Sequence, residues 1–247
     1  MEPAKQKTDV AGARKNGILA SLPDKEWKSV QPHLEEVELN FGEVLCNPEQ
    51  PIHNAYFMVS GVASLIVNLA DGSSVEVASL GSESLVGAGG LVRLPREAHT
   101  TLVQAQGRAY KIRIEQLQRL FHLCPQLRES ILRNLYLQTS TMAQTAACNR
   151  VHEVEQRLAR WLLILQDLIG GDHLVLTHEF LAIMLGTRRT TVTLAAGILQ
   201  SKRIIEYKRG KVHILDRKRL EKVCCECYSD LREFLASIPE MRPKDEN

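Results

Sequence analysis

The chain has 247 residues and a formal net charge of +2, and its 44% hydrophobic and 24% charged residues are typical of a soluble globular protein with one large or two ordinary domains. No apolar run approaches the roughly 20 residues of a membrane span, because Gln166 and Asp167 interrupt the densest run, 161–169. The polar N-terminus, 1–16, lacks the apolar core of a signal peptide and is expected to be a disordered tail. We therefore expect a cytoplasmic protein that does not contact a membrane.

The N-terminal half is predicted to be rich in β-strands after a small helix at 17–33. Within 35–113, short runs of alternating apolar and polar residues, such as 55–59 and 62–67, are separated by glycines. Asp71-Gly72 has the composition of a hairpin turn. Many short strands with regularly spaced turns predict a sandwich or jelly roll.

A long helix is predicted from Pro125, which suits a first helical turn, to about Asn149. Residues at alternating steps of four and three along it have the pattern of a coiled-coil seam. They are Ile131, Leu135, Gln138, Met142 and Thr145. We favour a homodimer paired through this seam, and the alternative is a helix packed on its own β domain. A second helix, at about 151–169, has one apolar face and ends at Gly170-Gly171.

The segment 176–215 has the order of a helix-turn-helix followed by a hairpin. Thr177 is a candidate N-cap of the first helix, Gly186 falls in the turn, and Gly210 lies between two short alternating runs. This order predicts a winged helix, whose second helix enters the major groove of DNA. The second helix offers Arg188, Arg189, Thr190 and Thr193 near its start, and the wing carries Lys208, Arg209 and Lys211.

Positive charge is concentrated in the same segment. Residues 186–219 hold ten basic and two acidic side chains, whereas the rest of the chain holds 21 basic and 27 acidic ones. A charge run is often only a solvated surface. Here the basic excess coincides with the element whose shape fits a DNA groove, as phosphate binding requires. The sequence therefore favours double-stranded DNA as a partner.

Three of the six cysteines, Cys224, Cys225 and Cys227, lie close together near the C-terminus. A metal site usually needs spaced pairs and further ligands, and three sulfurs on one helical turn point in different directions. We interpret these cysteines as small apolar residues that pack a terminal helix, and we expect no metal and no cofactor. A redox role depends on their thiol pKa, so the sequence leaves it open.

The order of the elements resembles that of the Crp/Fnr family of bacterial transcription regulators over roughly residues 17–225. The string Tyr-Phe-Met-Val-Ser-Gly at 56–61 is similar to the family's β-roll. The segment from Leu176-Thr177 to Val192, with Gly186 in its turn, is similar to the family's DNA-reading element. The resemblance implies a β-roll sensor, a long dimer helix and a winged helix-turn-helix.

The resemblance also implies roles for individual residues. Arg189 would read a guanine and Thr191 would contact a phosphate, whereas Thr190 and Leu194 stand where cAMP-responsive members have Glu and Arg. A different operator sequence is therefore implied. The residues expected to contact DNA are Thr177, Arg188, Arg189, Thr190, Thr191, Thr193, Lys208, Arg209 and Lys211.

The sensor departs from the pattern of the members that bind cyclic nucleotides. Those carry a Gly-Glu cassette followed by an arginine that holds the cyclic phosphate, whereas the matching region here, 82–91, is followed by Pro95-Arg96-Glu97-Ala98. Without a well-placed arginine, a phosphodiester loses its charge-assisted contact. We expect an unknown small-molecule effector other than cyclic AMP, or none. The candidate effector-pocket residues are Ser84, Gly87, Gly89, Gly90, Arg96, His99 and Thr100.

The expected fold class is α+β, with a double-stranded β-helix (jelly roll) sensor, a long dimerisation helix and a winged helix-turn-helix domain. The expected boundaries are 1–16 for the tail, 17–121 for the sensor, 122–149 for the dimerisation helix, 150–222 for the winged helix and 223–247 for a C-terminal helix and tail. We predict a regulator that binds a pseudo-palindromic operator as a homodimer and contacts RNA polymerase if it is an activator. The alternative is a cyclic-nucleotide-responsive regulator with a divergent phosphate cassette.

Other classes of function explain the sequence less well. The chain has no catalytic triad pattern and no P-loop, so we do not expect an enzyme. A cyclic-nucleotide-binding regulatory subunit without DNA activity would not need the basic segment. A purely structural dimer would leave Arg188 and Arg189 unexplained.

Overall fold

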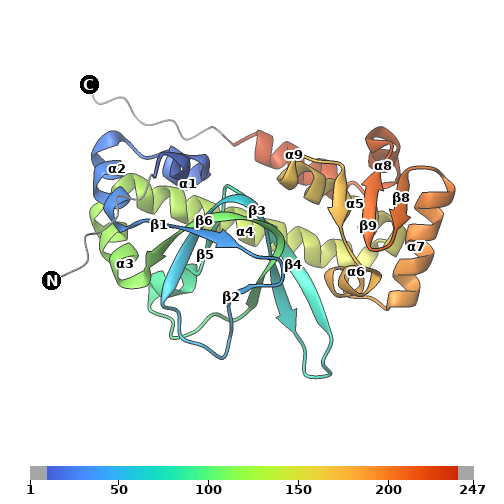
Figure 1. The fold of residues 1–247 in the computed structure, drawn as a ribbon, viewed down its shortest axis with the longest axis horizontal. Helices are drawn as coiled ribbons and strands as arrows, with labels where there is room; N and C mark the ends of the chain where they lie inside the picture. The colour runs from blue at the N-terminus through green and yellow to red at the C-terminus, as the bar shows by residue number, and fades with distance from the viewer. Residues whose placement is uncertain (1–9, 239–247) are drawn as a thin grey trace.

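Two long antiparallel strands organise the N-terminal half of the chain. In the computed structural model, which describes residues 10–238, β3 (Asn54–Asn68) and β6 (Thr100–Arg113) pair along most of their length. The strand order is β1-β6-β3-β4, with β2 beside β6 and β5 beside β3. The shorter strands are β1 (Glu35–Leu39), β2 (Val44–Cys46), β4 (Ser74–Leu80) and β5 (Leu85–Val86). Figure 1 shows the strands curling into a roll, which confirms the predicted β-roll in an α+β fold.

β3 bends at Gly61, between the two runs that the sequence predicts as separate strands. Gly61 has φ = +78°, and the register with β6 shifts on both sides of it. A Cβ atom at this position would lie 2.5 Å from the carbonyl oxygen of Ala105. The close approach therefore requires glycine, and the resulting bulge helps to curl the sheet. The Asp71-Gly72 turn joins β3 to β4, as predicted.

The segment before the roll is more ordered than the sequence predicts. A 3-10 helix at Ala11–Lys15 precedes α1 (Gly17–Ala20) and α2 (Asp24–Val30), in place of a single small helix. The buried side-chain amide of Asn16 donates to the carbonyls of Met58 and Ser84, and its oxygen caps α1. A polar sequence gives no sign of such long-range hydrogen bonds. Residues 10–16 are therefore not part of a disordered tail, whereas 1–9 lie outside the described residues.

The long helix α4 (Pro125–Val151) follows α3 (Ile114–Leu123) and lies along the roll (Figure 1). The face predicted as a dimer seam packs within its own chain. Ile131 is 0% exposed, Gln138 donates to the carbonyl of Leu85 at 3.3 Å, and Leu135 and Met142 pack on the β domain. Thr145 is buried and accepts a hydrogen bond from Arg160. This face therefore matches the alternative that the sequence left open.

The exposed face of α4 lies one residue further along the chain. Its middle part carries the small and apolar residues Leu132, Tyr136, Ala143, Ala146 and Ala147 together with Thr139, and Glu129 and Arg150 are exposed towards its two ends. One residue corresponds to about 100° around a helix. The exposed face therefore differs by this angle from the predicted seam, because periodicity alone does not distinguish packing on a β domain from packing on a second helix.

The C-terminal half contains a three-stranded sheet in the order β7-β9-β8, surrounded by helices. Its elements are α5 (Val154–Ile169), β7 (His173–Val175), α6 (His178–Met184), α7 (Arg189–Ser201), β8 (Ile205–Lys208), β9 (Lys211–Ile214), α8 (Arg217–Val223) and α9 (Cys227–Ala236). This order confirms the winged helix-turn-helix, with β7 as a strand that the sequence did not predict.

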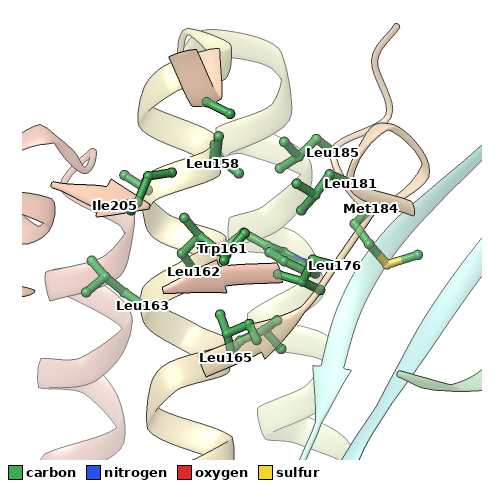
Figure 2. Close-up of a cluster of buried hydrophobic side chains, with 14 of the residues drawn as sticks. Leu158, Trp161, Leu162, Leu163, Leu165, Leu176, Leu181, Met184, Leu185 and Ile205 are labelled. Carbon is green, nitrogen blue, oxygen red and sulfur yellow. The ribbon is translucent and has the colours of Figure 1, made fainter. Parts of the chain in front are cut away.

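The core of this half forms around α5. Leu158, Trp161 and Leu162 of α5 pack against Leu181 and Leu185 from the helix-turn-helix (Figure 2). Burying each leucine contributes about 1.5–3 kcal/mol. This packing fixes the direction in which α7 presents its outer face. Among residues 10–238, no helix combines the length and apolar character needed to cross a membrane.

Candidate nucleic-acid interface

The helix-turn-helix holds α7 with one face in the core and the other in solvent. Thr177 caps α6, because its Oγ1 accepts a hydrogen bond from the N–H of Phe180 at 3.1 Å. Gly186 adopts φ = +55° in the turn, a conformation that favours glycine. The core side of α7 consists of Val192, Ala195, Ala196 and Leu199. The opposite face is therefore free to approach DNA.

The outer face of α7 carries groups suited to base recognition. Arg188, Arg189, Thr190 and Thr193 are all exposed. The side chain of Arg189 is 70% exposed, and its ion pair with Glu179 spans 4.0 Å. Such an exposed pair is weak, so the guanidinium remains available for the O6 and N7 atoms of a guanine.

Leu194 gives the same face of α7 an apolar character. Its side chain is 71% exposed, although it lies in the middle of a well-packed helix. An apolar side chain in the major groove suits the methyl group of thymine. This position therefore offers a contact different from that of the arginine which cAMP-responsive members have there.

Two aromatic residues that the sequence analysis did not single out hold Thr193. The Nδ1 atom of His178 lies 3.1 Å from Thr193 Oγ1, and the imidazole stacks on the ring of Tyr207 with 4.1 Å between centroids. Burial, followed by the charge of Arg189, lowers the pKa of His178, so the ring is neutral near pH 7. His178 thus orients Thr193 without adding positive charge. These residues come together only in the tertiary fold, which leaves no local sequence signal.

The wing presents its basic side chains on a tight hairpin. Lys208 pairs with Lys211, and the connecting residues Arg209 and Gly210 have φ = +51° and +73°. Positive φ at both central positions is the geometry of a type I′ turn. Lys208, Arg209 and Lys211 are exposed. The N–H of Leu176 donates to the Gly210 carbonyl at 2.8 Å, which keeps the wing beside the start of α6.

The turn before α7 also contacts the β-roll. Arg188, Arg189 and Thr191 line a groove of about 1030 Å³ together with the hairpin between β3 and β4. A Cβ atom on Gly186 would lie 2.7 Å from a methyl group of Val75 in β4. Thr191 is half-buried in this groove, unlike the other predicted DNA contacts. The sensor domain is therefore in direct contact with the DNA-reading element.

A cavity of about 260 Å³ lies between the β-roll and α4. Gly87, Gly89 and His99 line it, as predicted for an effector pocket, and Leu135 and Gln138 form part of its α4 wall. The other four predicted residues lie outside its lining. Ser84 bonds to Asn16, Gly90 packs on Ile114, Arg96 is exposed, and Thr100 bonds to Asn68.

The carboxylate of Glu97 accepts a hydrogen bond from a backbone N–H in the lining of this cavity. Its Oε1 accepts a hydrogen bond from the N–H of Gly89 at 2.9 Å. A phosphate binding to the same amide would meet a like charge or would have to displace it. Arg96 is on the surface, where its backbone bridges Pro51, and so does not replace a phosphate-binding arginine in this conformation.

Two family models match the chain. The cyclic nucleotide-binding domain matches residues 36–123, and the Crp-like helix-turn-helix domain matches residues 156–223. The global nitrogen regulator of Synechococcus elongatus is 27% identical over 221 residues, which cover 83% of this chain and 95% of that relative. Both halves of the chain thus have known counterparts.

Solved structures share the whole architecture. A transcriptional regulator of the Crp/Fnr family from Eubacterium rectale superposes with a TM-score of 0.70 at 19% identity, covering 85% of this chain and 98% of that one. The c-di-GMP-responsive global regulator CLP of Xanthomonas campestris gives 0.66 at 20% identity, covering 78% and 99%. FixK2 from Bradyrhizobium japonicum gives 0.66 at 16% identity, covering 78% and 98%.

A cyclic nucleotide-binding-like roll, a long helix and a Crp-like helix-turn-helix in one chain define a DNA-binding transcription regulator. The matches place the arginines of α7 and the wing in the element that gives this class its function. The chain thus combines a cyclic nucleotide-binding domain with a Crp-like helix-turn-helix domain, as in regulators of the Crp/Fnr type, which its sequence resemblance implied.

Proposed function

We propose that the protein acts in the cytoplasm as a homodimer and regulates transcription from a pseudo-palindromic operator. The observation that carries the proposal is the continuous exposed surface formed by the start of α7 and the wing, which the contacts Thr193–His178–Tyr207 join. A basic surface of this shape suits one half-site of duplex DNA. Contact with RNA polymerase follows if the output is activation.

The proposed DNA contacts fall into two groups. Arg189, Thr190 and Thr193, with Arg188 beside them, face the base edges. Thr177, Thr191 and the wing residues Lys208, Arg209 and Lys211 bind phosphates. The first group sets sequence preference, whereas the second supplies affinity that depends on salt.

The homodimer would form through the exposed stripe of α4 rather than through the seam predicted from the sequence. Leu132 and Tyr136 are 53% and 65% exposed in the single chain, and Thr139 and three alanines continue their line. Large apolar groups on an otherwise packed helix support pairing with a second copy, since small residues beside them permit close approach. Two recognition helices would then lie about 34 Å apart.

The effector is proposed to be a small molecule other than cyclic AMP, or the protein works without one. The hydrogen bond from Gly89 to Glu97 supports this proposal, because it places a negative charge where a cyclic phosphate would bind. The alternative, a cyclic-nucleotide-responsive regulator with a divergent cassette, requires Glu97 to leave Gly89 and an arginine to enter.

Selection of bound DNA from a random pool tests the proposal. The wild-type protein is expected to enrich a motif with two-fold symmetry, and Arg189→Ala is expected to lose the preference at one base in each half-site. Arg119→Ala on α3 is the matched control, because Arg119 is an exposed arginine that lies far from α7 in the sequence. Recovery of no motif, or of a motif without two-fold symmetry, would contradict the proposal.

A further inference from the structure

Three cysteines and one histidine meet where α4 ends. Cys148 lies in the last turn of α4 and His152 follows the helix, while Cys225 and Cys227 lie at the junction of α8 and α9. The four donor atoms, three sulfurs and an imidazole nitrogen, all lie within 4.8 Å of one another. We propose that these four residues bind a single zinc ion.

The sequence predicted no metal site because it placed all the C-terminal sulfurs on one helical turn. In the structure the cysteines lie on either side of a helix break, since α8 ends at Val223 and α9 begins at Cys227. The break brings Cys225 and Cys227 to the same side, whereas Cys224 Sγ bonds to the carbonyl of Cys225. The second pair of ligands, Cys148 and His152, is remote in sequence, with Cys148 77 residues before Cys225.

Two of the distances between donor atoms agree with a tetrahedral zinc centre. Bonds of about 2.3 Å to sulfur and about 2.0 Å to nitrogen give tetrahedron edges of roughly 3.8 Å between sulfurs and roughly 3.5 Å between sulfur and nitrogen. The Sγ atoms of Cys148 and Cys225 are 3.5 Å apart, and Cys227 Sγ lies 3.6 Å from His152 Nδ1. These two distances therefore differ from the tetrahedral edges by only a few tenths of an ångström, a rough figure from the same bond lengths, and the remaining pairs of donor atoms lie within 4.8 Å.

Glu226 orients the histidine for metal binding. Its Oε1 lies 3.1 Å from the Nε2 atom of His152, on the side of the ring away from the sulfurs. A carboxylate in this place holds the proton on Nε2 and leaves the lone pair of Nδ1 directed at the ion. This pairing of carboxylate, histidine and metal is the usual support of a zinc-binding imidazole.

The surroundings suit a closed structural site. Cys148, Cys225 and Cys227 are buried, and the side chain of His152 is 13% exposed. Four protein ligands leave no position for water or substrate. Three thiolates and one zinc ion carry a net charge of about −1, since binding releases the three thiol protons. The buried side chain of Arg157 interacts with Cys148 and Cys225 and offsets this charge.

The site would act on the connection between the two halves of the protein. His152 lies between the end of α4 at Val151 and the start of α5 at Val154, where the chain passes from the dimer helix to the DNA-binding domain. An ion shared by this link and α9 would fix the C-terminal helix against the hinge. The inference is independent of the operator and of the effector.

Metal analysis of the full chain, purified under reducing conditions, tests the proposal. We expect one zinc ion per chain by mass spectrometry, and Co²⁺ added to the metal-free protein should give the intense visible bands of a tetrahedral thiolate site. Cys227→Ser should abolish both signals, and Cys224→Ser is the matched control that should retain them. Glu226→Gln should weaken binding by about tenfold in a competition with a chromophoric chelator.

A further variant separates loss of the ligand from loss of the fold. His152→Cys should still bind one ion, with a stronger charge-transfer band from a fourth thiolate, whereas His152→Ala should not bind tightly. The zinc assignment is overturned if the reduced, folded wild-type protein gives no Co²⁺ bands, or if Cys224→Ser removes them as completely as Cys227→Ser. A Cys148–Cys225 disulfide, whose reduction restores no metal binding, would also overturn it.

Discussion

The indole Nε1 of Trp161 donates a hydrogen bond to Oε2 of Glu76 across 3.3 Å, which joins α5 of the DNA-binding domain to β4 of the sensor. Both side chains are buried, and Ser64 donates a second hydrogen bond to the same oxygen of Glu76. β4 also contacts the turn before α7, so the strand that carries Glu76 packs against the helix-turn-helix at a second place. The protonation of this buried carboxyl group therefore makes the stability of the packing between the two domains depend on pH.

Glu76→Gln is expected to remove part of the pH dependence of stability. Burial raises the pKa of Glu76 in the folded protein. A carboxyl whose pKa is higher in the folded state than in the unfolded state stabilises the fold at low pH and loses that contribution as pH rises through the folded value. Urea unfolding of the wild type should therefore show stability falling above the ordinary carboxyl pKa, and the variant should show a flatter profile. Glu38→Gln, at an exposed position on β1, is the control, and equal profiles for wild type and Glu76→Gln would contradict the prediction.

Changes on the exposed stripe of α4 are expected to dissociate the dimer. Tyr136→Glu would bring like charges together in a dimer paired through this stripe, so sedimentation should show monomers that keep a wild-type circular dichroism spectrum. Leu123→Glu is the matched control, because Leu123 is 76% exposed but lies on α3. Leu135→Glu should instead lower the free energy of unfolding, since Leu135 packs on the β domain. Dimers of unchanged affinity for Tyr136→Glu would show that the stripe is not the interface.

Arg189→Ala is expected to lower affinity for the selected operator by about 1–3 kcal/mol, since a bidentate contact to guanine is lost. The loss should be confined to sequences with the correct base, so affinity for unrelated DNA should change little. Fluorescence anisotropy with the operator and with a scrambled duplex measures both. An equal loss on both duplexes would mean that Arg189 contacts phosphates instead.

Arg209→Ala tests the wing by a different readout. Arg209 lies at the tip of the hairpin, in a turn whose geometry holds it away from the core. If Arg209 binds a phosphate, its loss should lower the affinity for DNA of every sequence by a similar factor. It should also reduce the slope of log affinity against log salt concentration by about one unit. A sequence-dependent effect, or an unchanged slope, would argue against a phosphate contact.

The sequence predicted the parts of the protein that depend on local signals. Gly186 and Gly210 in turns, Thr177 as a cap and the inward phase of Val192 all follow from short-range stereochemistry. The sequence did not show that Ile131 packs within its own chain, because an apolar residue at this position suits a β domain and a second helix equally well.

The contacts that the sequence did not reveal are made between distant residues. Asn16 reaches the carbonyl of Met58, and Cys148 approaches Cys225, in each case through a tertiary fold that no local pattern encodes. The sequence placed Glu97 near the candidate pocket. Its hydrogen bond with the N–H of Gly89 depends on how the loop between these residues folds back, which the sequence does not show.

Cyclic AMP is expected to bind the wild-type protein weakly or not at all. The N–H of Gly89 already donates a hydrogen bond to the Glu97 carboxylate, whose negative charge would repel a phosphate. Glu97→Gln keeps the size of the side chain and removes the charge, so any latent affinity for a cyclic phosphate should rise in this variant while the fold stays intact. Isothermal titration calorimetry of both proteins, and of Arg96→Ala, measures the effect. Micromolar or tighter binding by the wild type that Arg96→Ala abolishes would show that Arg96 moves in to hold the phosphate, and the cyclic-nucleotide-responsive alternative would then replace the present proposal. Binding that neither Glu97→Gln nor Arg96→Ala alters would place the nucleotide outside this cavity.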